Sequence, residues 1–263
     1  MWLDSHCHLA AGEFDLDRAA VLDRASEAGV DTFIAIGSGY GIAGNARAVE
    51  LAAADPRVFA TVGVHPHEAK ELDDEARALL EELIGRPRVV AVGECGLDYH
   101  YMNSERTVQR SVFAEQAANA RSRRMPATIH VRGDEPNAFE ELLDIWLAET
   151  RGEIEGVLHC YTGTLEFAQR AIEAGFYISF SGILTFKNDR GLRGVAKALP
   201  LERLLIETDA PLLAPQGFRG KRNEPAHVGA VGEILAALHA VPIEEIARAT
   251  TANARTLFRL DGG

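Results

Sequence analysis

The stretch Met1-Trp2-Leu3-Asp4-Ser5-His6-Cys7-His8 opens the chain, and its apolar start predicts a first β-strand that ends near His8. Side chains alternate between the two faces of a strand, so His6 and His8 are expected on one face and Cys7 on the other. Neutral imidazole is the commonest metal ligand among side chains. The His-x-His spacing is frequent by chance, but two imidazoles on one face predict half of a metal site.

Seven further apolar runs rich in β-forming residues follow, with helical patterns between successive pairs. The eight predicted strands are residues 2–8, 32–37, 58–65, 89–94, 127–131, 156–161, 177–182 and 204–209. Most are almost continuously hydrophobic, as expected of parallel strands covered on both faces. Because no linker or change of composition separates them, the sequence predicts one α/β domain over residues 1–263 with the (β/α)8 TIM-barrel fold.

Two global features agree with this fold. The length of 263 residues is close to the roughly 250 residues of such a barrel. No G-x-G-x-x-G motif follows the first strand, which removes the strongest signal for an open, dinucleotide-binding sheet.

Apolar spacing predicts several of the helices. The first stripe consists of Leu16, Ala20, Ala25 and Ala28, with Gly29 as the C-cap. The second stripe consists of Leu79, Leu80, Leu83 and Ile84. Longer helices are predicted over residues 104–124, 135–149 and 226–240, and a closing pair of short helices over 242–260. The apolar face of the helix over 135–149 is predicted to be Phe139, Leu142, Leu143 and Trp146.

Composition places the chain among ordinary globular proteins, with 47% hydrophobic and 25% charged residues. No apolar run approaches the roughly 20 residues that span a bilayer, and no signal peptide is recognisable, so we expect a cytoplasmic protein without membrane contact, and a monomer. Three cysteines are too few for a disulfide framework. The net charge of -12 argues against coating of long nucleic acid, but permits an enzyme that handles one or two phosphates with bound cations.

Ionisable side chains gather at the ends of the predicted strands, where barrels of this kind carry their catalytic residues. The residues at these ends are His6, His8, His65, Glu94, His130, His159 and Asp209. A hydrogen-bonded core histidine is the ordinary explanation for any one of them. Five of the nine histidines at such positions favour a metal centre instead.

The donor types restrict the metal and the reaction. Imidazole and carboxylate ligands suit Zn, Mn, Fe, Ni, Co or Mg. Six ligands are too many for one tetrahedral zinc ion and suit two divalent metal ions that share a carboxylate. Such a pair can activate a bridging water and stabilise the attacking and leaving oxygens of a displacement at phosphorus. The sequence therefore predicts two divalent ions and a hydrolytic reaction.

Three cysteines directly neighbour these candidate ligands. Cys7, Cys95 and Cys160 would point away from the ligands if each lies on an extended strand. We therefore expect buried, inert thiols that face the helices rather than metal ligands.

Several short motifs resemble the TatD family of metal-dependent deoxyribonucleases, within the amidohydrolase-like barrels. The motifs are residues 3–9 (LDSHCHL), 63–66 (GVHP), 93–99 (GECGLDY), 129–132 (IHVR), 159–163 (HCYTG), 207–211 (ETDAP), 222–225 (RNEP) and the tail 253–258. They cover essentially the whole chain. The Gly-Glu-x-Gly-Leu-Asp-Tyr and Glu-Thr-Asp-x-Pro pieces are the most specific. Local departures from the family pattern occur at Ala10, Ala127, Asp134 and Pro136.

The resemblance implies a ligand set for each ion. The residues implied for one ion are His6, His8, Glu94 and Asp209, and those implied for the other are Glu94, His130 and His159. Glu94 is then the bridging ligand, and a glutamate bridge is typical of the TatD branch. Asp209 is implied as the catalytic group that orients and deprotonates the attacking water, a role that suits a carboxylate beside both metal and water.

Other residues are candidates for supporting roles. We expect His65 and Arg132 to contact a phosphate or the leaving group, with capping or support of a ligand as the alternative. Glu207 is two residues before Asp209 on the same strand face and is expected to orient a ligand. The basic residues Arg219, Lys221 and Arg222 either bind phosphates or are solvated, and Tyr99 and Tyr101 are candidates to stack on a terminal base.

The leading hypothesis is a metal-dependent phosphodiesterase that hydrolyses DNA, acting as an exonuclease on single-stranded or frayed ends, with a metal-bound hydroxide as nucleophile. DNA ends or oligonucleotides are the expected substrates. A second hypothesis is an ester or amide hydrolase with the same site, for example an aminoacyl-tRNA deacylase. A third is a non-catalytic metal-binding scaffold, which the full ligand set argues against.

Overall fold

The computed structural model describes residues 1–133 and 137–260. Two of the departures from the family pattern, Asp134 and Pro136, lie outside the described residues. The chain divides into two compact units. The first unit comprises Met1–Ile34, His159–Ile172 and Tyr177–Gly263, and the second comprises Ala35–Leu158 and Glu173–Phe176.

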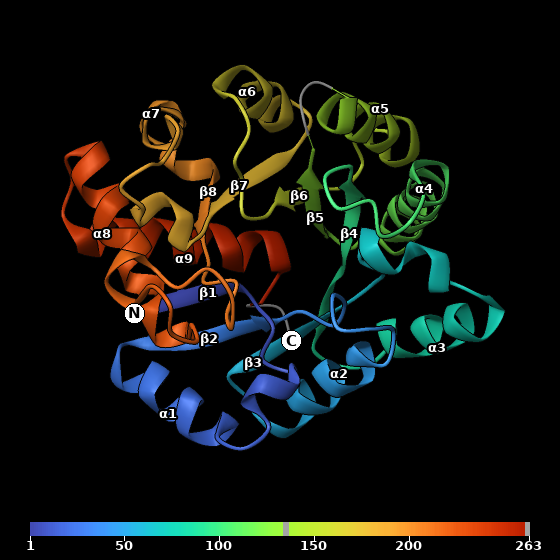
Figure 1. The fold of residues 1–263 in the computed structure, drawn as a ribbon, viewed down its shortest axis with the longest axis horizontal. Helices are drawn as coiled ribbons and strands as arrows, with labels where there is room; N and C mark the ends of the chain where they lie inside the picture. Colours follow the sequence, from blue (N-terminus) through green and yellow to red (C-terminus); the bar gives the residue numbers. More distant parts are fainter. Residues whose placement is uncertain (134–136, 261–263) are drawn as a thin grey trace. The chain divides into compact units, whose positions relative to one another are not determined.

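The second unit is built on parallel strands that follow one another in chain order. They are β3 (Val58–Val62), β4 (Val89–Asp98), β5 (Ala127–Arg132) and β6 (Gly156–Leu158). The helices of this unit are α2 (Gly44–Ala54), α3 (Asp74–Ile84), α4 (Arg106–Arg123) and α5 (Asn137–Thr150), which lie along the same side of these strands (Figure 1). The predicted apolar face of α5 is buried, because Phe139, Leu142, Leu143 and Trp146 pack inward.

An irregularity in β4 sets the direction of Glu94. The pairing of β4 with β5 shifts register between Gly93 and Cys95, so Glu94 has no regular partner on β5. A bulge of this kind re-aims a side chain near functional sites. Gly96, two residues on, has φ 137°, and a Cβ there would overlap the carbonyl oxygen of His130. The close approach of β4 and β5 beside Glu94 therefore requires glycine at this position.

In the first unit, the first strand lies beside the last. The strands are β1 (Trp2–Cys7), β2 (Val30–Ala35), β7 (Phe176–Phe180) and β8 (Leu204–Ile206), and β7 pairs with β8 in parallel. Beyond β8, the backbone N–H of Asp209 donates to the carbonyl of His6 at 2.9 Å, and the N–H of His8 donates to the carbonyl of Ala210 at 2.7 Å. These bonds bring residues two hundred positions apart into one place.

The remaining helices are α1 (Arg18–Glu27), α6 (Leu165–Glu173), α7 (Leu192–Ala198), α8 (Val228–His239) and α9 (Ile243–Phe258). Short 3-10 turns are η1 (Gly12–Phe14), η2 (Pro66–Glu71), η3 (Gly182–Thr185), η4 (Leu201–Arg203), η5 (Gln216–Phe218) and η6 (Pro225–His227). Among the described residues no single helix is long and apolar enough to span a membrane, although η6–α8 and α9 pass the same length and composition test as a pair bent by 112°.

Two helix predictions were wrong in detail. Leu16 is fully exposed and precedes α1, whose buried face is Val21, Leu22 and Ala25. The closing segment is one 16-residue helix, α9, rather than a pair of short helices. No glycine or proline interrupts residues 243–258, and buried residues such as Ile246, Thr250, Ala254 and Phe258 keep one helical face continuous.

All eight predicted strands are present, but several end earlier than predicted. His65, His159 and Asp209 follow β3, β6 and β8 instead of ending them. Asp209 has φ 55° and Cys160, next to His159, has φ 45°, so the chain is no longer extended there. By contrast, β4 runs on to Asp98, four residues beyond its predicted end.

Candidate metal centre

In the first unit, three predicted ligands meet within a small volume. Asp209 Oδ1 lies 3.6 Å from His6 Nε2 and 3.3 Å from His8 Nε2. All three side chains are buried. Burial alone would raise the pKa of Asp209, but the hydrogen bond and charge of His8 and the charge of His6 lower it. The group is thus an ionised carboxylate facing two imidazoles.

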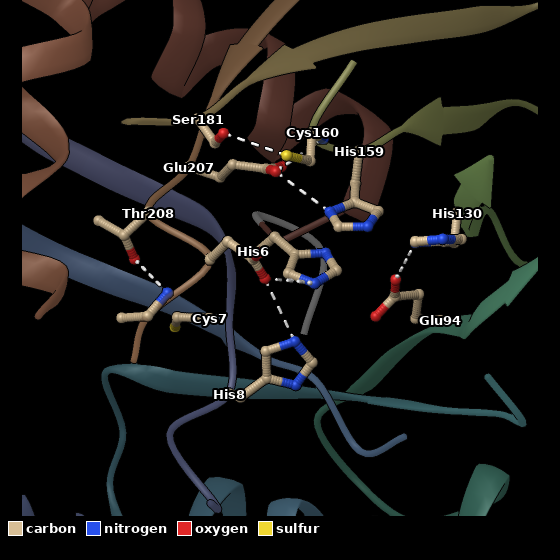
Figure 2. Close-up of polar contacts among 12 residues, drawn as sticks. His6, Cys7, His8, Glu94, His130, His159, Cys160, Ser181, Glu207 and Thr208 are labelled. Carbon is tan, nitrogen blue, oxygen red and sulfur yellow. Dashed lines mark hydrogen bonds and ion pairs between the residues drawn. The ribbon is translucent and has the colours of Figure 1, made fainter. Parts of the chain in front are cut away.

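His159 joins this cluster through its ring and is fixed by Glu207. The rings of His6 and His159 stack with centroids 3.8 Å apart. Glu207 Oε1 lies 3.1 Å from Nδ1 of His159 and accepts the backbone N–H of Cys160 at 2.7 Å (Figure 2). A carboxylate at Nδ1 holds the ring proton there, which makes Nε2 the nitrogen that can bind a metal. Glu207 therefore contacts a candidate ligand, in the position expected of an orienting group.

The loop that carries Asp209 is held by hydrogen bonds between two buried side chains and Thr208. Asp4 on β1 accepts the N–H of Thr208 at 3.0 Å and its hydroxyl at 2.5 Å. Asn223 donates its side-chain amide to the carbonyl of Thr208 at 2.9 Å. Asp209 is thereby held from both sides by neighbours that are themselves buried.

In the second unit, Glu94 is the centre of a second cluster. Its Oε1 lies 3.4 Å from His65 Nε2. The same oxygen lies 3.1 Å from His130 Nδ1, a contact shown in Figure 2. Glu94 and His65 are buried, and His130 is partly buried. A nitrogen and a carboxylate oxygen at this separation can both bind one divalent cation.

The tautomer of His65 distinguishes its role from that of His130. The backbone N–H of His67 donates to His65 Nδ1 at 3.1 Å. Burial lowers the pKa of His65 to about 4 despite the nearby charge of Glu94, so the ring is neutral near pH 7 and carries its proton on Nε2. His65 consequently presents an N–H group to Glu94 and no lone pair for a metal.

Asp98 holds His130 from the opposite side. Its Oδ2 lies 3.1 Å from His130 Nε2 and 2.9 Å from His67 Nε2. Burial alone would raise the pKa of Asp98, but these two histidines and the N–H of Tyr101 lower it. A proton held on His130 Nε2 leaves Nδ1, which faces Glu94, as the metal-binding nitrogen.

Both clusters fit divalent metal ions by donor chemistry. In each group the candidate ligand atoms all lie within 4.8 Å of one another. The groups are His6, His8 and Asp209 in the first unit, and His65, Glu94 and His130 in the second. In the second group the available donors are Glu94 and His130, because the proton on His65 Nε2 leaves that ring without a lone pair for a metal. Nitrogen and carboxylate donors of this kind are those of zinc and other first-row metals.

Comparisons with known proteins identify the family of this chain. Residues 3–259 match the family described as TatD related DNase. The chain belongs to this family. It is 40% identical over 261 residues to the uncharacterized metal-dependent hydrolase YabD of Bacillus subtilis, covering 99% of this chain and 100% of YabD. It is 35% identical to a protein of Cronobacter turicensis named 3'-5' ssDNA/RNA exonuclease TatD, with 97% of each chain covered.

A solved structure supports the same assignment. The crystal structure of YJJV, a TatD homologue from Escherichia coli K12, has a TM-score of 0.88 and 31% identity, with 98% of each chain covered. The predicted TatD family and (β/α)8 TIM-barrel fold are confirmed. The chain is a TatD-family metal-dependent hydrolase.

The predicted ligands of this TatD-family protein lie in two groups. The first unit brings together His6, His8, His159 and Asp209, and the second brings together His65, Glu94 and His130. Sequence reasoning missed Asp98 and His67. Asp98 could have been found, because it follows Glu94 by four residues in a strand that also carries the specific motif.

Buried side-chain amides hold the loops that carry these groups. Asn45 pairs with the N–H and carbonyl of Gly63, and Gln116 pairs in the same way with Val64, directly before His65. Gln109 accepts the N–H of Asp98 at 2.7 Å and donates to its carbonyl at 3.0 Å. Gly63 and Val64 lie beyond the end of β3, so the amides of Asn45 and Gln116 replace a neighbouring strand there. Gln109 does the same for the last residue of β4 on the side away from β5.

Two cysteines of this TatD-family protein lie as predicted. Cys7 and Cys95 are fully buried, and burial raises the pKa of both thiols. Cys160 is half-buried, follows β6 and lies 3.1 Å from the Ser181 hydroxyl (Figure 2), so the premise of an extended strand was wrong there. No cysteine joins the metal-capable groups found in residues 1–133 and 137–260.

The candidate substrate contacts have different surroundings. Arg132 is exposed, and its guanidinium lies 4.7 Å from the centre of the Tyr101 ring. Tyr99 is buried and donates its hydroxyl to Glu141, so it is not available to stack on a base. Arg222 is paired with Asp17 and Glu224, which makes it a structural residue.

Proposed function

We propose that this protein is a divalent-metal-dependent phosphodiesterase that hydrolyses DNA, acting as an exonuclease on single-stranded or frayed ends by a two-metal mechanism. The observation that carries the proposal is the pair of buried clusters in which imidazoles face the carboxylates of Asp209 and Glu94. The similarity to a protein named 3'-5' ssDNA/RNA exonuclease supports the same substrate class.

The proposed ligands follow the family resemblance. The set for one ion is His6, His8, Glu94 and Asp209, and the set for the other is Glu94, His130 and His159, with Glu94 as the bridge. When bound, two such ions lower the pKa of water and neutralise charge that develops on a phosphate. The proposed ions are divalent metals that accept nitrogen and oxygen donors, namely Mg, Mn, Zn, Ni, Fe or Co.

The protein side chains have separate tasks in this proposal. Asp209 is ionised and accepts the proton of the attacking water. Glu207 holds His159 and Asp98 holds His130 in the orientation that leaves a lone pair for the metal. His65 presents an N–H group, which suits a phosphate oxygen as well as Glu94.

The net charge of the protein favours single-stranded over long double-stranded DNA as the substrate. The net charge of -12 disfavours long duplexes, whose binding depends on many cationic contacts. Arg132 is the exposed cation proposed to contact a phosphate near the second cluster. Short or single-stranded ends therefore suit this surface better than continuous double helix. The cytoplasmic location and the monomeric state remain predictions.

End-labelled oligonucleotides test the proposal. Protein supplied with Mg or Mn is expected to release nucleotides from single-stranded DNA, and chelation should stop the release. Asp209→Asn should lower the rate by about 1,000-fold or more, because the proton acceptor and a metal ligand are lost. Asp74→Asn, an equivalent change of a fully exposed carboxylate on α3, serves as the matched control.

The outcomes separate this function from its alternative. Equal residual activity in wild type and Asp209→Asn would show that the nuclease activity is a contaminant. Metal-dependent cleavage of carboxyl esters or amides without nucleotide release would favour the ester or amide hydrolase. Circular dichroism of both variants establishes that the fold is kept.

A further inference from the structure

The turn after β4 presents one tyrosine to solvent close to the second cluster. Tyr101 keeps 54% of its surface exposed. Its neighbour Tyr99 is buried and engaged with Glu141, so the two tyrosines of this turn have opposite environments. The exposed ring of Tyr101 is therefore open to a ligand, whereas the ring of Tyr99 is not.

The backbone of this turn is rigidly anchored. Asp98 Oδ1 accepts the N–H of His100 at 2.9 Å and the N–H of Tyr101 at 2.8 Å. The other oxygen of the same carboxylate contacts His130. A single buried side chain therefore connects the position of the Tyr101 ring to the orientation of a candidate metal ligand.

Three side chains also contact the ring of Tyr101. His67 and His100 approach in T-shaped geometry, with centroids 5.5 Å and 4.8 Å away. The guanidinium of Arg132 lies over one face at 4.7 Å from the centroid. Despite these contacts, about half of the Tyr101 surface stays open to solvent, with an exposed fraction of 54%.

We propose that Tyr101 and Arg132 form a subsite in which a nucleobase of the substrate strand stacks on Tyr101 while Arg132 contacts the adjoining phosphate. This inference rests on the proposed nuclease function, and it assigns to Tyr101 and Arg132 the binding of the end of the substrate strand. Stacking on an aromatic ring accepts any base, which suits a non-specific nuclease. The cation held over the ring supplies a positive charge for a phosphate in a protein whose net charge is -12.

Abasic substitution tests the subsite. The substrates are thymidine oligonucleotides that each carry one abasic residue, placed at a different distance from the digested end. They are assayed with wild type, Tyr101→Phe, Tyr101→Leu and Arg132→Lys. For wild type we expect one position at which loss of the base raises KM by about 5-fold to 100-fold, the range for removal of one stacked base, with kcat nearly unchanged. Tyr101→Leu should abolish this penalty, and Tyr101→Phe should retain it.

Arg86→Lys is the matched control for Arg132→Lys. Arg86 precedes β4, whereas Tyr101 follows it, so the two residues lie at opposite ends of the same strand, and Arg86 is paired only on the surface with Glu82. This variant should keep the wild-type abasic profile. Arg132→Lys should raise KM for all substrates, because the charge remains but its planar stacking on Tyr101 is lost.

Distinct results overturn the two proposals. An active wild type whose abasic profile is the same in Tyr101→Leu overturns the subsite and leaves the nuclease function intact. A wild type that releases no nucleotide overturns the nuclease function itself. Quenching of 2-aminopurine in a short oligonucleotide, measured with Asp209→Asn and with Asp209→Asn/Tyr101→Leu, reports stacking without turnover, and equal quenching by both proteins also overturns the subsite.

Discussion

Asp98 Oδ2 lies 3.1 Å from Nε2 of His130, on the side of the ring opposite to Glu94. Asp98 is buried, and its other oxygen accepts two backbone N–H groups of the following turn. One carboxylate thus fixes the tautomer of a candidate metal ligand and the shape of the loop beside it. Histidine ligands are commonly held in this way, and the carboxylate then contributes to metal affinity without touching the metal.

The first prediction concerns this contact. Asp98→Asn should weaken binding of Mn by about 10-fold to 100-fold, because an amide holds the proton of His130 less firmly than a carboxylate does. Calorimetric titration of chelator-treated protein measures the affinity. Asp74→Asn should bind Mn like wild type, and unchanged affinity in Asp98→Asn would contradict the role given to this carboxylate.

The second prediction concerns the glycine between Glu94 and Asp98. Gly96→Ala should lower the free energy of unfolding by about 3 kcal/mol or more, since the positive φ and the carbonyl of His130 exclude a Cβ. Gly194→Ala is the control, because Gly194 lies in α7 with open space around it. There the alanine should stabilise the protein by about 0.5–1 kcal/mol. Denaturant unfolding compares both, and similar stabilities would refute the argument.

The third prediction concerns a buried amide. Gln109→Leu should destabilise the protein by about 2–5 kcal/mol, because the N–H and carbonyl of Asp98 and the carbonyl of Ser104 lose their partner in a buried place. Thermal and denaturant unfolding give the measurement. Gln169→Leu, the same change at an exposed position of α6, should stay near wild type. A small effect at Gln109 would mean that water replaces the amide.

The fourth prediction concerns pH. Hydrogen bonds from Arg222 lower the pKa of Asp17, and hydrogen bonds from Arg24 lower the pKa of Glu224. Carboxylates whose pKa is lower in the folded state stabilise the fold above their unfolded pKa, near 4, and lose this contribution as the pH falls through the folded pKa. Arg222→Gln should therefore melt below wild type at pH 7, and the two melting temperatures should converge below about pH 4.

The control for this pH series is Arg86→Gln, which removes an exposed pair within α3 and the turn after it. Its melting temperature should follow wild type across the series, because isolated exposed pairs contribute little. A constant difference between wild type and Arg222→Gln from pH 7 to pH 3 would show that Arg222 acts by packing rather than by charge.

Much of the fold could be predicted because each strand carries its own signal. Apolar runs such as Val58–Val62 and Phe176–Phe180 identify themselves by composition, and their alternation with helical stripes leaves few architectures. The residues at which the strands end were less predictable. β8 ends at Ile206, and Asp209, three residues later, has φ 55°. No glycine or proline is directly beside Asp209, so the sequence gives no local signal for this change of backbone conformation.

The sequence by itself determined which side chains are candidate ligands, because imidazoles and carboxylates at strand ends have few other uses in this fold. Only the tertiary structure decided what each one contacts. The carboxylate of Asp98 behind His130 and the hydrogen bond of Tyr99 to Glu141 join segments that are distant in the sequence. Such bonds depend on distances of about 3 Å that no local pattern of residues encodes.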